Sequence, residues 1–148
     1  MTTTAPRVDG RAIGLAHYAS RAVLEHVLAP HGLTFLQFVT LRLASVTDGP
    51  AGETALIDGV AGTVKVDEAE VRRAIGDLHG AGLLTSEEPS GVRLTEAGRE
   101  LYATAAAETT AIADRLYAGI PEEDRSVAGR VLALVTERAD AELAALRK

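Results

Sequence analysis

The chain has 148 residues, of which 47% are hydrophobic, so it is long and apolar enough to bury a core and is not a disordered polymer. It contains no cysteine, which excludes disulfides, thiolate nucleophiles and cysteine-ligated metal sites. Its net charge is −6, so any contact with nucleic acid must come from local basic patches and not from the overall charge. No signal-peptide pattern or apolar run of transmembrane length is seen, and we expect a cytoplasmic protein without membrane contact.

The first third of the chain predicts two helices. Apolar residues recur at helical spacing after Asp9, a residue type that caps helix N-termini, and this predicts a helix over about 9–29. Thr34 and Gln37 have the spacing of a capping box, which predicts a second helix that ends near residues 48–50. Because the chain is also rich in alanine and only 3% aromatic, we expect a mainly α fold.

The middle of the chain predicts a helix-turn-helix followed by a β-hairpin. Two short helices are expected, one from Thr54 to about Val60 and one over 67–81, separated by a turn at 62–66. We expect the side chain of Asp67 to cap the second helix and the glycines at 80–82 to end it in a left-handed turn. Short β-prone segments at 83–86 and 92–94 flank a Pro- and Gly-containing tip, which predicts a hairpin wing.

The last third of the chain predicts two long helices. Thr95 is expected to cap the first of them, which continues through Tyr117 and is broken at Pro121 before the final helix. The predicted fold is therefore a mainly α, winged helix-turn-helix protein with one domain, 1–148. Its winged core covers about 50–98, and the long helices over about 9–29 and 99–148 lie outside that core.

Three motifs make this order of elements more specific. Residues 31–38 (HGLTFLQF) resemble the G-L-T-x-x-Q-[FW] start of the second helix in the MarR family of bacterial regulators. Residues 78–83 (LHGAGL) resemble the end of that family's recognition helix, and 94–98 (LTEAG) resemble its L-T-x-x-G motif after the wing. The chain thus resembles the MarR family over nearly its whole length. The resemblance implies a homodimer built by the first and last helices, which binds a near-palindromic double-stranded DNA site.

The resemblance also implies which residues contact DNA. The 67–81 helix would enter the major groove and the wing would reach the neighbouring minor groove. A carboxylate is included among the candidates because it can accept a hydrogen bond from the cytosine amino group. Glu68 and Arg72 are four residues apart, so we expect an ion pair that engages one arginine. The candidate DNA-binding residues are Lys65, Glu70, Arg72, Arg73 and Arg93.

A ligand site is the second implied feature. The resemblance implies a crevice between the dimer helices and the winged domain that accepts an aromatic or anionic small molecule. An arginine among apolar side chains suits a carboxylate or phenolate. For the phenylalanines the alternative is core packing, and for the first-helix residues it is the dimer interface or solvent. The candidate ligand-binding residues are His17, Arg21, Phe35, Phe38 and Arg42.

The predicted function is a DNA-binding regulator, which the resemblance implies is a repressor. A small-molecule effector is expected to change its DNA affinity by altering the spacing of the two recognition helices. Between Glu53 and Gly98, however, nine acidic residues face four basic ones, and the family's D-x-R element is absent from the wing. These observations motivate an alternative: a ligand-binding or catalytic protein on the same scaffold that no longer binds DNA. A third possibility is a module that pairs with a more basic paralogue.

Enzymatic and metal-binding functions find little support in the sequence. The chain has no H-E-x-x-H, no glycine-rich phosphate loop and no G-x-S-x-G motif. His26 and His31 are separated by Pro30 and need not share a helix face, so a histidine metal site is not expected. We therefore predict a non-enzyme without catalytic residues, cofactor or metal.

Overall fold

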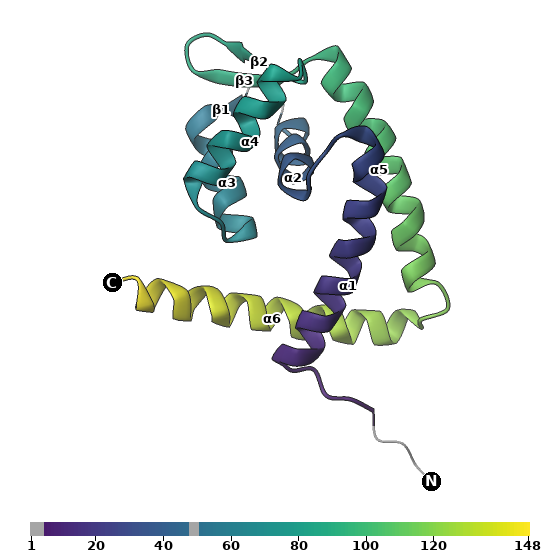
Figure 1. Cartoon of the computed structure of the whole chain (residues 1–148). Helices are drawn as coiled ribbons and strands as arrows, with labels where there is room; N and C mark the ends of the chain where they lie inside the picture. The colour runs from purple at the N-terminus through teal and green to yellow at the C-terminus, as the bar shows by residue number, and fades with distance from the viewer. Residues whose placement is uncertain (1–4, 48–50) are drawn as a thin grey trace. The chain divides into compact units, whose positions relative to one another are not determined.

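The computed structural model of the chain describes residues 5–47 and 51–148 (Figure 1). The predicted end of the second helix, at residues 48–50, lies outside the described residues. The chain divides into two compact units, a first that ends at Thr110 and a second, Ala111–Lys148. The winged helix-turn-helix lies entirely in the first unit.

Two local capping signals place the first helices. Helix α1 (Gly10–Leu28) begins where the Asp9 carboxylate accepts a hydrogen bond of 2.8 Å from the backbone N–H of Ala12, as predicted. It continues into a short 3-10 helix, η1 (Ala29–His31). Helix α2 (Phe35–Ser45) begins at a complete capping box, in which the side chains of Thr34 and Gln37 each accept from the other residue's backbone N–H.

The helix-turn-helix is formed by α3 (Glu53–Val64) and α4 (Glu68–Gly80). The predicted turn at 62–66 was too long, because α3 continues to Val64 and Lys65 alone makes the left-handed turn at φ 63°. Asp67 occupies the N-cap position of α4, but its side chain makes no capping hydrogen bond, so that detail of the prediction was wrong. Its backbone carbonyl accepts instead from the N–H groups of Glu70 and Val71.

The wing is a three-stranded antiparallel sheet in the order β1-β3-β2. Strands β2 (Leu84–Glu87) and β3 (Gly91–Leu94) form the predicted hairpin, with Leu84 opposite Leu94. The sequence did not predict strand β1 (Ala51–Gly52), which pairs with Val92 and Gly91 of β3. Two residues carry no alternating pattern, so a strand this short has no signal of its own.

Helix α2 is central to the first unit and packs against α1, α3, α4 and β3. Its buried polar residue Thr40 is fully inaccessible to solvent, and its hydroxyl donates to the Leu36 carbonyl at 2.8 Å. The remaining core is aliphatic apart from Phe38. The largest fully buried apolar side chains are Leu28, Leu41, Ile57, Val60, Val71, Leu78 and Val92.

The wing is joined to the following helix by a close backbone junction around Leu83. The N–H of Thr95 donates to the Leu83 carbonyl at 3.1 Å, and the Thr95 hydroxyl donates to the Gly82 carbonyl at 2.7 Å. The same hydroxyl accepts from the N–H of Gly98, so Thr95 caps α5 (Glu96–Tyr117) as predicted. A Cβ atom on Gly98 would overlap the Leu83 carbonyl oxygen, which explains a glycine at this buried helical position.

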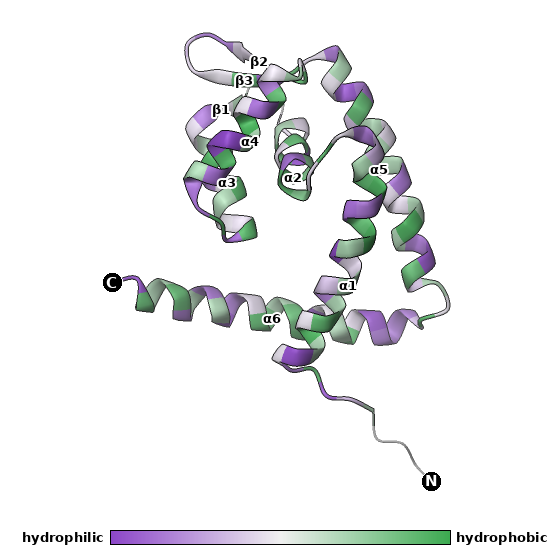
Figure 2. Ribbon diagram, viewed as in Figure 1, coloured by the Kyte–Doolittle hydropathy of each residue, from purple (hydrophilic) through white to green (hydrophobic). Residues whose placement is uncertain are grey.

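The second unit contains the end of α5 and all of α6 (Glu122–Leu146), joined through Gly119 at φ 80° and Pro121. None of the residues of α6 is buried, although apolar and polar residues alternate along it (Figure 2). Exposed apolar side chains occur along its whole length, and Val127 and Leu134, two helical turns apart, share one side. The exposed apolar side chains include Val127, Leu132, Leu134 and Val135, each more than 40% exposed, and Leu146 at 80%.

Among the described helices, no single one has the length and apolar character needed to cross a membrane. Residues Gly10–His31 and Phe35–Ser45 meet that test only when taken together, across a bend of 81°.

The junction at Gly98 yields the first prediction. Gly98→Ala should lower the free energy of unfolding by about 1–3 kcal/mol, because the added methyl group meets backbone that cannot rotate away. The control is Gly76→Ala in α4, where nothing lies within 4 Å of the new Cβ. That change should raise stability by about 0.5–1 kcal/mol. Urea unfolding at one protein concentration measures both, and equal stability of the two variants would contradict the assigned junction.

Candidate functional site

Helix α4 has a buried side and an exposed side with different compositions. Its buried residues are Val71, Ala74, Ile75 and Leu78, which lie in the core. With 3.6 residues per turn, the positions opposite them include Ala69, Arg72, Arg73 and Gly76, and all four are exposed. We call these four residues the α4 stripe. It combines two arginines with two residues too small to block a close approach to a flat or grooved partner.

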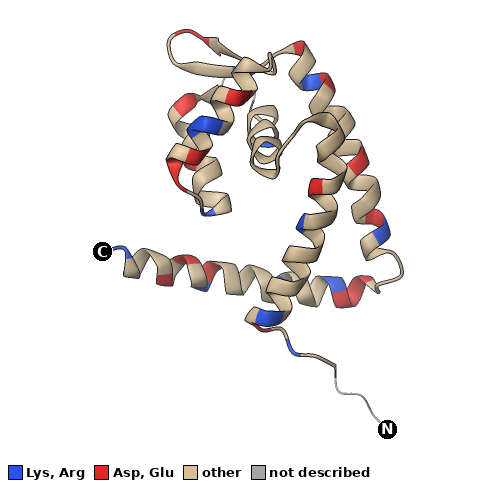
Figure 3. Cartoon of the chain, viewed as in Figure 1, with Lys and Arg blue, Asp and Glu red and all other residues tan. Residues whose placement is uncertain are grey.

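Helix α4 carries both acidic and basic segments (Figure 3). Glu68 and Glu70 lie on its flanks. Asp77, in contrast, is exposed one turn after Arg73 and lies as far around the helix from the buried side as Arg72. Glu68 forms the predicted ion pair with Arg72, at 3.7 Å between Oε2 and Nη2, and both side chains are more than half exposed. Such an exposed pair contributes only a few tenths of a kcal/mol, so it holds Arg72 weakly. Glu70 lies on the other flank and lines a hollow that is described below.

The other two predicted DNA-binding cations lie at the turn and in the wing. The Lys65 ammonium donates to the Gly62 carbonyl, which closes the end of α3. Arg93 lies on the exposed side of β3, where its Nε is 3.2 Å from Oε2 of Glu87 on the neighbouring strand. The charge of Arg93 is therefore partly compensated within the wing.

The predicted ligand-binding residues converge on a hollow of about 570 Å³. Of the five candidates, the structure brings four together here, from α1 and α2: His17, Arg21, Phe35 and Arg42. Aliphatic side chains and Thr63 complete the lining, and no lining residue is acidic. We call this the cationic hollow, because it carries two guanidinium groups in a chain whose net charge is −6.

Arg21 is held in place by two contacts. Its guanidinium carbon lies 4.5 Å from the ring centroid of Phe35, in a cation–π arrangement. Its Nε donates to Oε1 of Glu25, one turn further along α1, at 2.7 Å. The planar group is thus oriented by an aromatic face, and its remaining N–H groups are suited to a carboxylate.

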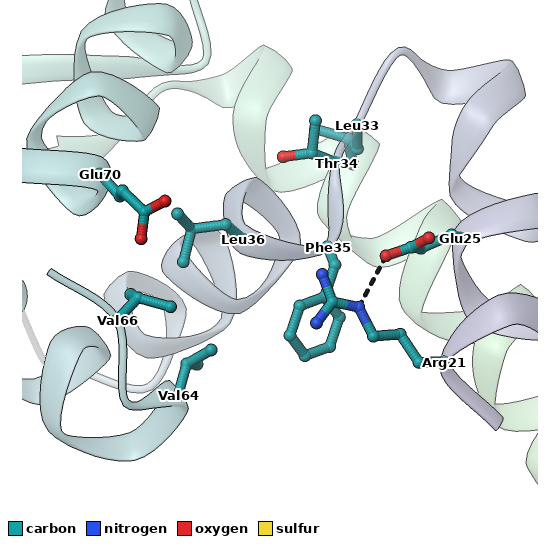
Figure 4. A pocket seen from close by; sticks show the side chains of 9 residues that line it. All are labelled: Arg21, Glu25, Leu33, Thr34, Phe35, Leu36, Val64, Val66 and Glu70. Atoms are coloured by element: carbon teal, nitrogen blue, oxygen red, sulfur yellow. Dashed lines mark hydrogen bonds and ion pairs between the residues drawn. The ribbon is translucent and has the colours of Figure 1, made fainter. Parts of the chain in front are cut away.

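A second hollow of about 480 Å³ adjoins the first and shares Arg21, Phe35 and Val64 with it (Figure 4). It differs in charge, because two carboxylates, from Glu25 and Glu70, line it from opposite sides. We call it the acidic hollow. The Glu70 carboxylate points toward Leu36 and Val66 in this hollow, which places it apart from the α4 stripe.

Phe38 is the predicted ligand-binding residue that lies elsewhere. It is buried, lines neither hollow, and packs against Tyr102 of α5 with 5.5 Å between ring centroids. Phe35 and Phe38 are both on α2, but Phe38 packs in the core, whereas Phe35 lines the hollow. The sequence missed Val39, Leu43, Thr63 and Val64 as lining residues, the last two because the end of α3 was expected to be a turn.

The structure was compared with known proteins. It is similar to CouR from Rhodococcus jostii RHA1 bound to p-coumaroyl-CoA, with a TM-score of 0.75, 23% identity and coverage of 85% of this chain and 90% of that one. It is also similar to a MarR family protein of Mycobacterium tuberculosis in complex with DNA, with a TM-score of 0.68, 24% identity and coverage of 88% and 98%. A MarR family transcriptional regulator from Rhodococcus sp. RHA1 gives a TM-score of 0.72, 22% identity and coverage of 88% and 97%.

The chain has the MarR fold. At these identities the likeness extends to the architecture alone, which confirms the predicted winged helix-turn-helix. No protein-family model and no curated protein matches the sequence. The roles of individual residues must therefore be argued from their positions in this MarR-like chain.

Among residues 5–47 and 51–148, no group of three or more histidine, aspartate or glutamate side chains is arranged to hold a metal ion.

The cationic hollow yields the second prediction. Arg42→Gln should weaken binding of the aromatic sulfonate 1-anilinonaphthalene-8-sulfonate about threefold to tenfold, because a charge-assisted contact is lost. Binding of the uncharged analogue N-phenyl-1-naphthylamine should change less than twofold. Fluorescence titration measures both probes. An equal loss for the two would mean that Arg42 contributes shape and not charge to this hollow.

Proposed function

We propose that this protein is a DNA-binding transcriptional regulator that acts as a homodimer and responds to an anionic aromatic effector. The observation that carries the proposal is the exposed α4 stripe on a MarR-like fold. It presents Arg72 and Arg73 between Ala69 and Gly76 on the side of α4 that faces away from the core. A recognition helix in a major groove uses this arrangement, in which arginine reads guanine and small residues permit close approach.

Part of the acidic composition of the winged region is engaged within the protein, although Asp77 remains exposed one turn after Arg73. Glu68 is paired with Arg72, Glu87 lies beside Arg93, and Glu70 lines the acidic hollow. Phosphate contacts would come from Lys65, Arg72, Arg73 and Arg93, doubled in a dimer to about eight cations. A similar fold has been solved with DNA, in the M. tuberculosis protein, which supports DNA as the partner.

The effector site of the proposal is the cationic hollow. Arg21 and Arg42 would bind an acidic group, while Phe35 and the aliphatic lining would contact an aromatic ring. The similar CouR structure is bound to p-coumaroyl-CoA, which supports a ligand with an aromatic acyl group. Because the hollow is lined by α1, α2 and the end of α3, occupancy would shift the population of helix arrangements. A coupling of about 1–3 kcal/mol is enough to control DNA binding.

The homodimer is supported by the exposed apolar side chains outside the winged core. Leu15 and Tyr18 of α1 are more than half exposed, and the apolar residues of α6 lie in open solvent in the isolated chain. Exposed apolar surface at helical spacing marks an interface with another helix. We propose that these helices bury this surface against a second copy, so that two α4 stripes contact one near-palindromic operator. We further propose that the protein is a repressor and that it is cytoplasmic.

Arg73 of the α4 stripe provides the test of DNA binding. In fluorescence anisotropy with the protein's own upstream DNA, the unaltered chain should bind in a saturable and sequence-dependent manner. Arg73→Ala should weaken that binding about tenfold to 100-fold, because one base or phosphate contact is lost in each half-site.

The matched control is Arg147→Ala, which removes the same charge at the end of α6, outside the winged core. It should change the affinity less than threefold. If the unaltered chain shows no saturable binding at low salt, DNA is not the partner, and a ligand-binding protein on the same scaffold becomes the better interpretation.

The dimer has a test of its own. Leu134→Glu in α6 should convert the dimer to a monomer, because a charge on the proposed interface must be desolvated. Sedimentation equilibrium measures the mass, and Glu137→Gln, which changes an exposed residue of the same helix without adding a charge, is the control that should remain dimeric. A chain that sediments as a monomer without any substitution would refute the proposed assembly.

A further inference from the structure

The two hollows have opposite charge and a common wall. Arg42 and His17 line the cationic hollow alone, and Glu70 lines the acidic hollow alone. Between them lie Arg21, Phe35 and Val64, which line both. A ligand that extends along the ring of Phe35 from one hollow into the other would therefore meet cations at one end and a carboxylate at the opposite end.

The two carboxylates of the acidic hollow differ in their engagement. Glu25 is bonded to Arg21 at 2.7 Å, so its charge is compensated within the site. Glu70 forms no ion pair with any residue in 5–47 or 51–148, and its carboxylate points into the hollow (Figure 4). Glu70 is exposed on α4 and points toward the apolar side chains of Leu36 and Val66, while Arg21, Glu25 and Thr34 supply the polar part of the lining. Glu70 is thus the group with a free charge for a ligand.

We infer that the effector is bipolar: an aromatic acid that carries a protonated amine at the end of the ring opposite its carboxylate. The inference rests on the proposed function and adds the ligand class. Arg42 and Arg21 bind the carboxylate in the cationic hollow, Phe35 stacks on the ring, and Glu70 accepts a hydrogen bond from the ammonium in the acidic hollow.

Glu70 also links the ligand to the recognition helix. It is one helical turn before Arg73, so a ligand that draws on Glu70 acts directly on the N-terminal half of α4. The amine end of the ligand is therefore the end that affects DNA contact. This assigns Glu70 to effector sensing, whereas the sequence had suggested that it reads cytosine.

The test compares two probes that differ only in the amine, 4-(aminomethyl)benzoate and 4-methylbenzoate. Isothermal titration calorimetry on the full chain should give about tenfold tighter binding of the aminomethyl compound, since a charged hydrogen bond is added. Glu70→Gln should reduce that ratio to about one and leave the affinity for 4-methylbenzoate within twofold. Glu68→Gln, on the same helix but outside both hollows, should keep the tenfold ratio.

The outcomes separate this inference from the proposed function. Equal binding of the two probes by the unaltered chain, or a preference that survives Glu70→Gln, overturns the bipolar ligand. If 4-methylbenzoate still lowers DNA affinity in anisotropy under those results, the proposed regulator stands without the amine. If neither probe binds, both the bipolar ligand and the cationic hollow as effector site are refuted, while DNA binding is judged by the Arg73 comparison.

Discussion

The close contact between Gly98 and the Leu83 carbonyl is the constraint on which the arrangement of the winged core depends. Leu83 follows the end of α4 and leads into β2, and Gly98 is in the first turn of α5. Thr95 closes the junction through its hydroxyl and its backbone N–H. Helix α4, the wing and α5 therefore meet at one close backbone contact, so a displacement of α4 at this point would also move α5.

The features predicted correctly from the sequence are those encoded by local chemistry. Asp9, Thr34 and Thr95 each accept a backbone N–H within three residues, so short motifs located three helix starts. The features missed depend on tertiary contacts. Strand β1 forms because its backbone pairs with the edge of β3. Phe38 packs on Tyr102, which is 64 positions away along the chain. The clustering of His17, Arg21, Phe35 and Arg42 followed from helix faces, but the lining by Val64 required the fold.

The charge of the winged region illustrates why a count of residues is a poor guide to a surface. Nine acids against four bases suggest a face that repels DNA. The helix, however, places these residues on different sides: Glu68 and Glu70 lie on the flanks of α4, while Arg72 and Arg73 share its exposed side with two small residues and with Asp77. The electrostatic potential that a bound partner experiences is set mainly by the charged residues that face it. The net charge of the chain acts over longer distances, at which salt screens its effect.

Under the proposed function, the same placement would give α4 two separate roles on two sides. Glu70 faces the acidic hollow and Arg73 faces outward, and one helical turn separates them along the chain. Coupling between an effector and a nucleic acid then needs no path through the protein, because both ligands would bind the same helix. A small rotation or shift of α4 that brings Glu70 closer to a cationic group would change the direction of Arg73 by the same motion. The junction at Leu83 holds the C-terminal end of α4. The N-terminal end has no side-chain cap, because the Asp67 side chain makes no capping hydrogen bond, so a shift of α4 would be largest at that end.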